Sequence, residues 1–152
     1  MTDLPTEAAG WTRTAVTEGE WAGWNLYVND PFETYAGPFY ERVDEDGGVV
    51  CAFRAQPHHL NGGGFMHGGA IMTFADFCIF VFAREAMKDS HGVTATFNGE
   101  FVGAVPPGAL VEARGEVVKA GRSMVFTRGL ITTIGEPVMS FSAVIKKTSP
   151  RK

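Results

Sequence analysis

The sequence has few cysteines, no excess of basic residues and no long uninterrupted apolar run. Its two cysteines, Cys51 and Cys78, stand among apolar neighbours outside any CxxC pair, which predicts two buried, reduced thiols. The formal net charge of -4 gives no basic face of the kind that neutralises nucleic-acid phosphates. We therefore expect a protein that does not bind nucleic acid and that resides in a reducing compartment.

Membrane and secretion signals are also missing. The longest apolar stretch, Ala70–Ala83, is shorter than the roughly 20 residues that a membrane-spanning helix needs, and it contains Asp76. Residues 1–10 include Asp3 and Glu7 and lack the apolar segment of a secretory signal. These absences predict a cytoplasmic protein that does not associate with membranes.

The composition that remains is that of one globular domain. The chain has 152 residues, of which 45% are hydrophobic and 20% are charged. Residues 1–37 are rich in aromatic side chains, and we expect an N-terminal extension of short helical or irregular structure packed on the core. This extension either covers the core or shapes a substrate pocket or a subunit contact. Residues 38–148 are predicted to form the main domain, and residues 149–152 a tail.

The main domain shows two different periodicities. Residues 39–43 are strand-like and residues 49–53 are an apolar run, with an Asp- and Gly-rich turn between them, which predicts a β-hairpin. From Gly68 to about Met87 there is no proline and no glycine after Gly69, which predicts one long helix that is apolar nearly all round and therefore buried.

Four further strands are predicted after this helix, separated by turn residues at even spacing as in an antiparallel meander. They cover residues 93–101, 109–119, 123–133 and 137–147. The order of hairpin, buried helix and four strands predicts an α+β fold in which an antiparallel sheet wraps around one long central helix.

Asp76 is the residue in the predicted helix that is hardest to explain by packing. It is the only formal charge between Met66 and Ala83 if His67 is neutral. Burial disfavours the charged form of a carboxyl group, so an apolar helix that carries one needs a reason. Either the carboxylate accepts hydrogen bonds from Thr73, a loop amide or a partner subunit, or it faces a cleft as a general base or nucleophile.

A glycine-rich loop leads into the same helix. It reads Asn61-Gly-Gly-Gly-Phe-Met-His67-Gly68-Gly69, and the unpaired amides at the helix start could stabilise an oxyanion. Asp76 stands eight residues beyond Gly68, about 12 Å along a helix axis. Because one carbonyl group does not easily reach both the amides and the carboxylate of one helix, the spacing favours a site shared between two chains.

The pattern Asn-x-x-Gly-x-x-His-Gly-Gly, followed by Asp76 at the helix centre, resembles the hotdog-fold thioesterases of the phenylacetate-pathway and thioesterase-superfamily type. The resemblance implies a hotdog fold that hydrolyses acyl-CoA thioesters without a metal or a cofactor, coenzyme A being part of the substrate. It also implies a homodimer with active sites between subunits, or a homotetramer of two such dimers.

The resemblance assigns roles to individual residues. The amide of Gly68 polarises the thioester carbonyl, and the carboxylate of Asp76 from the facing subunit acts as nucleophile or as general base on water. Asn61 holds the thioester or the water, His67 lies near the site, and Thr94 supplies a hydroxyl that orients water.

Three further residues are expected to contact the substrate: Gly69 beside the oxyanion donor, and Arg122 and Ser123 through the phosphates of coenzyme A. An exposed turn is the alternative explanation for Arg122 and Ser123.

His58, His59 and His67 lack the spacing of a metal site, so no metal is predicted. An enoyl-CoA hydratase would need an Asp and His pair that the chain lacks. An acyl-CoA-binding module without turnover is the alternative from another functional class.

Overall fold

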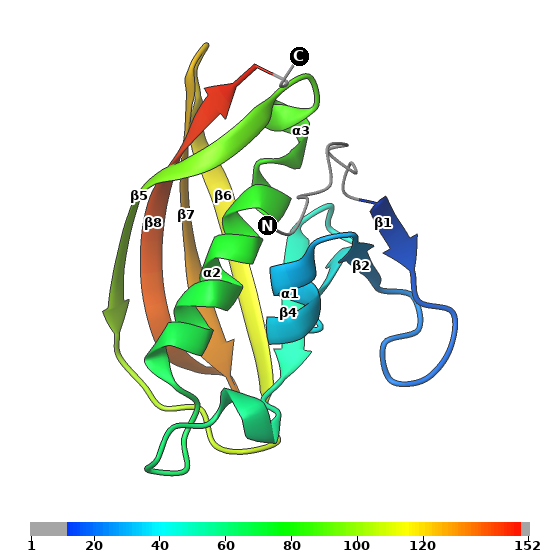
Figure 1. The fold of residues 1–152 in the computed structure, drawn as a ribbon, viewed down its shortest axis with the longest axis vertical. Helices are drawn as coiled ribbons and strands as arrows, with labels where there is room; N and C mark the ends of the chain where they lie inside the picture. Colours follow the sequence, from blue (N-terminus) through cyan, green and yellow to red (C-terminus); the bar gives the residue numbers. More distant parts are fainter. Residues whose placement is uncertain (1–11, 150–152) are drawn as a thin grey trace, which may run out of the picture.

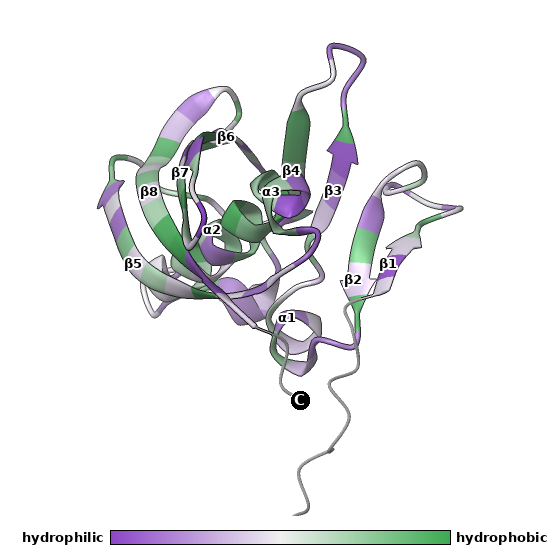
Figure 2. Cartoon of the chain, turned by 90° about the horizontal axis from the view of Figure 1, so that it is seen from above, coloured by the Kyte–Doolittle hydropathy of each residue, from purple (hydrophilic) through white to green (hydrophobic). Residues whose placement is uncertain are grey.

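Helix α2 (Gly68–Phe82) lies against the concave face of an antiparallel sheet in the computed structural model, which describes residues 12–149 (Figure 1). The eight strands of this sheet follow the order β1-β2-β3-β4-β6-β7-β8-β5. Seen from above, the sheet curls around α2 (Figure 2). The predicted α+β architecture, an antiparallel sheet around one central helix, is confirmed.

The strands of the main domain begin and end within two residues of their predicted positions. The full set of elements is β1 (Thr12–Ala15), β2 (Asn25–Val28), α1 (Pro31–Ala36), β3 (Tyr40–Val43), β4 (Val49–Arg54), the 3-10 helix η1 (Pro57–His59), α2, α3 (Arg84–Met87), β5 (His91–Phe101), β6 (Leu110–Ala120), β7 (Met124–Thr133) and β8 (Glu136–Thr148).

The predicted four-strand meander is wrong at its first strand. Only β6, β7 and β8 follow one another in the sheet, whereas β5 pairs with β8 and forms the edge of the sheet. The connection between β5 and β6 passes the N-terminal end of α2. There Val105 is buried, and its carbonyl accepts the Met66 amide at 2.9 Å. This anchored crossing places β6 beside β4 and leaves β5 with one free edge.

The prediction of a single helix reaching Met87 is also wrong. Helix α2 ends at Phe82, because Ala83 adopts φ -85° and ψ 0° before the short helix α3 begins. No glycine or proline marks this break. The change of direction brings Arg84 to the N-terminal strands, where its Nη1 donates to Tyr27 Oη at 3.1 Å and to Glu41 Oε1 at 3.0 Å.

The N-terminal segment differs from the helical or irregular structure that its composition suggested. Strands β1 and β2 form an antiparallel hairpin, and Asn25 continues the sheet by pairing with Glu41. Helix α1 then packs on α2. Residues 1–11 and 150–152 lie outside the described part of the chain, so the proposed division into extension, domain and tail stays a prediction.

The core lies between α2 and the sheet. Phe74 and Ile79 of α2 and Phe53 of β4 are fully buried, as are the inward side chains of β6, β7 and β8. Cys51 and Cys78 are both buried and free. Two facing glycines, Gly115 and Gly129, let the rings of Phe82 and Phe141 approach the sheet, since a Cβ at either glycine would overlap a ring.

A buried ion-pair network ties the N-terminal hairpin to this core. Glu41 of β3 is fully buried, and its carboxylate is bound by Arg13 of β1 and Arg84 of α3. Arg13 donates through both Nε and Nη2, the second at 3.1 Å. A buried carboxylate with charged partners on both sides is stable only while those partners remain.

We predict that Glu41→Gln lowers the free energy of unfolding by about 3 kcal/mol, because two guanidinium groups lose their shared counter-ion. Urea unfolding measures this change. Glu116→Gln is the matched control, since Glu116 pairs with Arg128 at an exposed position and should change stability by less than about 1 kcal/mol. Equal effects of the two substitutions would show that the Glu41 network is not a structural anchor.

Candidate active site

Asp76 lies at the centre of α2 and is half-buried. Thr94 of β5 donates a hydrogen bond from Oγ1 to Asp76 Oδ1 at 2.6 Å. Thr73, the intrahelical partner considered from the sequence, instead donates to the Gly69 carbonyl at 2.9 Å. The carboxylate of Asp76 is thus positioned by a hydroxyl on the neighbouring strand.

A cavity of about 610 Å³ opens beside Asp76, a size typical of small-molecule sites. Helices α2 and α3 give it an apolar wall of Phe77, Phe80, Val81 and Met87. N-terminal residues add a polar part to the lining, namely Arg13, Tyr27, Asp30 and Glu33. Asp76 therefore faces a chamber whose lining is partly apolar and partly charged.

Glu33 adds a further carboxyl group to this cavity, one that was not predicted from the sequence. Burial raises the pKa of Glu33 to about 7, and the charges of Asp30 and Asp76 add to the increase. The sequence did contain a signal, because Asp30 followed by Pro31 is typical of a helix start, and Glu33 stands in the first turn of that helix.

The loop before α2 is organised by its own side chains. Asn61 Oδ1 accepts the amides of Gly63 at 2.9 Å and Phe65 at 3.3 Å. His67 caps α2, since its Nδ1 accepts the Gly69 amide at 2.8 Å. Within residues 12–149 the amide of Gly68 meets no acceptor, so this N–H is available at the positive end of the helix.

The predicted site residues do not all come together in one chain. Asp76 and Thr94 are in contact, whereas Asn61, His67, Gly68 and Gly69 lie at the start of α2 and do not line the Asp76 cavity. Two turns of helix, about 12 Å, separate Gly68 from Asp76.

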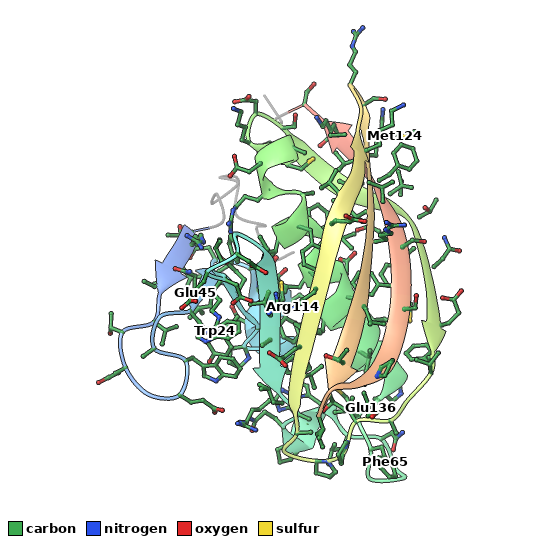
Figure 3. All side chains as sticks on the ribbon, turned by 180° about the vertical axis from the view of Figure 1, so that it is seen from behind. Trp24, Glu45, Phe65, Arg114, Met124 and Glu136 are labelled. Carbon is green, nitrogen blue, oxygen red and sulfur yellow. The ribbon has the colours of Figure 1, made fainter. Side chains whose placement is uncertain are left out.

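Arg122 and Ser123 occupy the exposed turn between β6 and β7 and do not line the cavity. Figure 3 shows Met124, next to this turn, and Phe65, in the loop before α2, at opposite ends of the molecule. The turn and the glycine loop of one chain are therefore far apart.

A family model described as thioesterase superfamily matches residues 63–139. The chain is also 31% identical over 122 residues to "Putative esterase PA0474" of Pseudomonas aeruginosa, a match that covers 78% of this chain and 90% of that protein. The chain belongs to the thioesterase superfamily.

Solved structures of this kind share the fold. A hypothetical thioesterase of Streptococcus pneumoniae, solved with coenzyme A, has a TM-score of 0.65 and 23% identity, covering 75% of this chain and 88% of that one. A mutant of the phenylacetic acid degradation protein PaaI from Thermus thermophilus has a TM-score of 0.65 and 24% identity, covering 78% of this chain and all of that one.

The matched superfamily region contains Gly68, Asp76, Thr94 and Arg122, but it excludes the polar part of the lining that Arg13 to Glu33 contribute. No group of three His, Cys, Asp or Glu side chains within residues 12–149 could hold a metal ion. The helices of that same part of the chain are too short or too polar to cross a membrane.

His59 connects the loop before α2 to helix α1. The Gln56 amide donates to its Nδ1 at 2.9 Å, so Nε2 carries the proton and donates to the Ala36 carbonyl at 2.6 Å. The His59 carbonyl accepts the His67 amide at 2.7 Å. Burial lowers the pKa of this imidazole from its ordinary 6.5, against the raising effect of the Ala36 hydrogen bond.

When a histidine has a lower pKa in the folded state than in the unfolded state, its contribution to stability is complete only at a pH above the unfolded pKa. We therefore predict that the contribution of His59 to the free energy of unfolding decreases as the pH falls from about 6.5, because the unfolded chain binds a proton that folded His59 resists. Glu33, whose pKa is raised to about 7, contributes with the opposite sign over the same range. Urea unfolding at pH 7, 6 and 5 measures this.

The free energy of unfolding of the wild type minus that of His59→Gln should decrease from pH 7 to pH 5, because the contribution of Glu33 is common to both proteins and cancels. His58→Gln alters the exposed neighbour and should keep the wild-type dependence. The assignment is wrong if the two variants respond to pH alike.

Proposed function

We propose that this protein hydrolyses acyl-CoA thioesters to a carboxylic acid and coenzyme A, with Asp76 as general base or nucleophile. The observation that carries the proposal is a hydrogen-bonded carboxylate that opens on a ligand-sized cavity in a chain of the thioesterase superfamily. The coenzyme A bound to the pneumococcal neighbour supports the substrate class.

The site residues would have different roles in the reaction. Thr94 holds one oxygen of the Asp76 carboxylate, which leaves the other for water or for the carbonyl carbon. The free amide of Gly68 would stabilise the negative charge that develops on the carbonyl oxygen. Asn61 and His67 keep the loop and the helix start in the shape that presents this amide.

We further propose that each site is built from two chains, Asp76 from one and Gly68 from the other. On α2, Gly69, Met72 and Asp76 lie on one exposed or half-exposed face. Strand β5 beside it has a free edge and exposes Val93 and Phe101. A second copy paired here would cover this apolar surface and bring its own helix start to Asp76.

Further expectations about assembly, location and substrate contacts belong to this proposal. The outer face of the sheet exposes Val118, Met124 and Phe126, a second apolar surface through which two dimers would form a homotetramer. The buried free thiols of Cys51 and Cys78 fit the cytoplasm. Arg122 and Ser123 are proposed as phosphate contacts for coenzyme A, and Gly69 as a contact of the thioester.

We predict that Asp76→Asn and Asp76→Ala lower kcat for thiol release by at least about 100-fold, because both remove the base or nucleophile. Release of coenzyme A thiol from a panel of acyl-CoAs measures this. Asp46→Asn, in the exposed turn between β3 and β4, should retain full activity.

If the wild-type protein binds acyl-CoA but releases no thiol, it is a binding module and the hydrolase proposal fails. If Asp76→Ala retains the wild-type rate, the assignment of Asp76 fails.

A mixed dimer tests the shared site. Gly68→Pro removes the amide donor but suits the first position of a helix, and His67 before it has the extended backbone that proline requires, at φ -64° and ψ 136°. We expect Gly68→Pro and Asp76→Asn each to lose about 100-fold in kcat as homodimers.

A doubly tagged dimer of one Gly68→Pro chain and one Asp76→Asn chain has one intact shared site. It should therefore recover about half of the wild-type activity. If both groups act within one chain, every site in this mixed dimer is damaged and no activity returns.

A further inference from the structure

Two carboxyl groups of the cavity at Asp76, those of Asp30 and Glu33, lie outside residues 63–139, the region matched to the superfamily. Glu33 is held in place by the backbone of α1. Its amide donates to Asp30 Oδ1 at 2.9 Å, and its carbonyl accepts the Gly37 amide at 2.7 Å. Because α1 packs on α2, Glu33 lines the same cavity as Phe77 and Phe80 of α2.

The surroundings of the Asp76 and Glu33 carboxyl groups differ. Asp76 accepts the Thr94 hydroxyl, whereas no hydrogen bond reaches the Glu33 carboxyl from any residue between 12 and 149. A carboxyl group in a partly apolar cavity keeps its proton more readily when other carboxylates share the cavity and no donor stabilises its charge. The pKa of about 7 for Glu33, which shares the cavity with Asp30 and Asp76, agrees with this.

We propose that Glu33 is a further catalytic residue, the general acid that protonates the sulfur of the departing coenzyme A. This inference rests on the proposed hydrolase function. In the general-base route, Asp76 takes a proton from water as the water oxygen bonds to the carbonyl carbon. When the C–S bond breaks, the electron pair stays on sulfur, and sulfur takes the proton of Glu33.

The cycle closes without another reactant. Asp76 releases its proton to solvent and the Glu33 carboxylate takes one from solvent, so one water is consumed and one acid and one thiol are released. If Asp76 attacks the carbonyl directly, Glu33 gives the same proton to sulfur, and water then cleaves the acyl-aspartyl anhydride.

Other charged groups also face the cavity, from every element around it. They are Arg13 of β1, Tyr27 of β2, Asp30 at the start of α1, Arg84 of α3, and Lys88 and His91. Among these types of side chain, histidine is the one that ordinarily titrates near neutral pH. His91 must therefore be separated from Glu33 in any measurement of pH dependence.

The test is the pH profile of kcat/KM for thiol release by the full chain, with the best acyl-CoA of the panel. Since the acid must carry its proton, wild-type kcat/KM should fall as the pH rises through about 7. Glu33→Gln keeps the shape of the side chain but has no proton to give. It should lose about 100-fold at pH 6 and show no decline near pH 7.

Three variants serve as controls. Glu33→Asp keeps a carboxyl group and should retain the decline at a reduced rate. Glu45→Gln, in an exposed turn, should match the wild type, and His91→Gln should keep the decline. Urea unfolding of Glu33→Gln at pH 7 verifies that the variant is folded.

The outcomes separate the two proposals. If wild-type protein releases thiol but folded Glu33→Gln keeps the decline near pH 7, or keeps the wild-type rate, Glu33 is not the acid. If His91→Gln abolishes the decline instead, the acid is His91 and the inference is wrong. If wild-type protein releases no thiol at any pH, the hydrolase function itself fails.

Discussion

The hydrogen bond from Thr94 Oγ1 to Asp76 Oδ1 is the interaction on which the proposed site depends. It spans 2.6 Å and joins the centre of α2 to the edge strand β5. A carboxylate among buried Phe74, Phe77 and Ile79 is costly without a partner, and this hydroxyl supplies one without neutralising the charge. The fold thus gives the Asp76 carboxylate a hydrogen-bond partner and a fixed orientation beside the cavity.

The same helix is the basis of the proposed site between two chains. Gly68 begins α2 with an amide that meets no acceptor within residues 12–149, and Asp76 lies two turns later on a half-exposed face of the helix. A straight helix holds these two groups about 12 Å apart, farther than one carbonyl group can bridge. The rigid element that positions both groups therefore favours a site completed by a second copy across the free edge of β5.

Much of the fold and of the candidate site could be predicted from the sequence, because both show strong local sequence patterns. The charge of Asp76 in an apolar helix and the glycine loop before that helix marked the candidate site, and strand periodicity marked β6 to β8. The break at Ala83 and the place of β5 could not be predicted, since they depend on contacts distant in sequence, namely Arg84 with Glu41 and Met66 with Val105. Glu33 was missed because its role depends on α1 packing against α2.

A crystal structure with a non-hydrolysable ketone analogue of an acyl-CoA tests the central claim, a shared site, most directly. The account predicts that the ketone oxygen lies about 3 Å from the Gly68 amide of one chain, with the carbonyl carbon facing Asp76 of the other. Gly68 and Asp76 of the same chain around one carbonyl, or a carbonyl remote from Asp76, would contradict it.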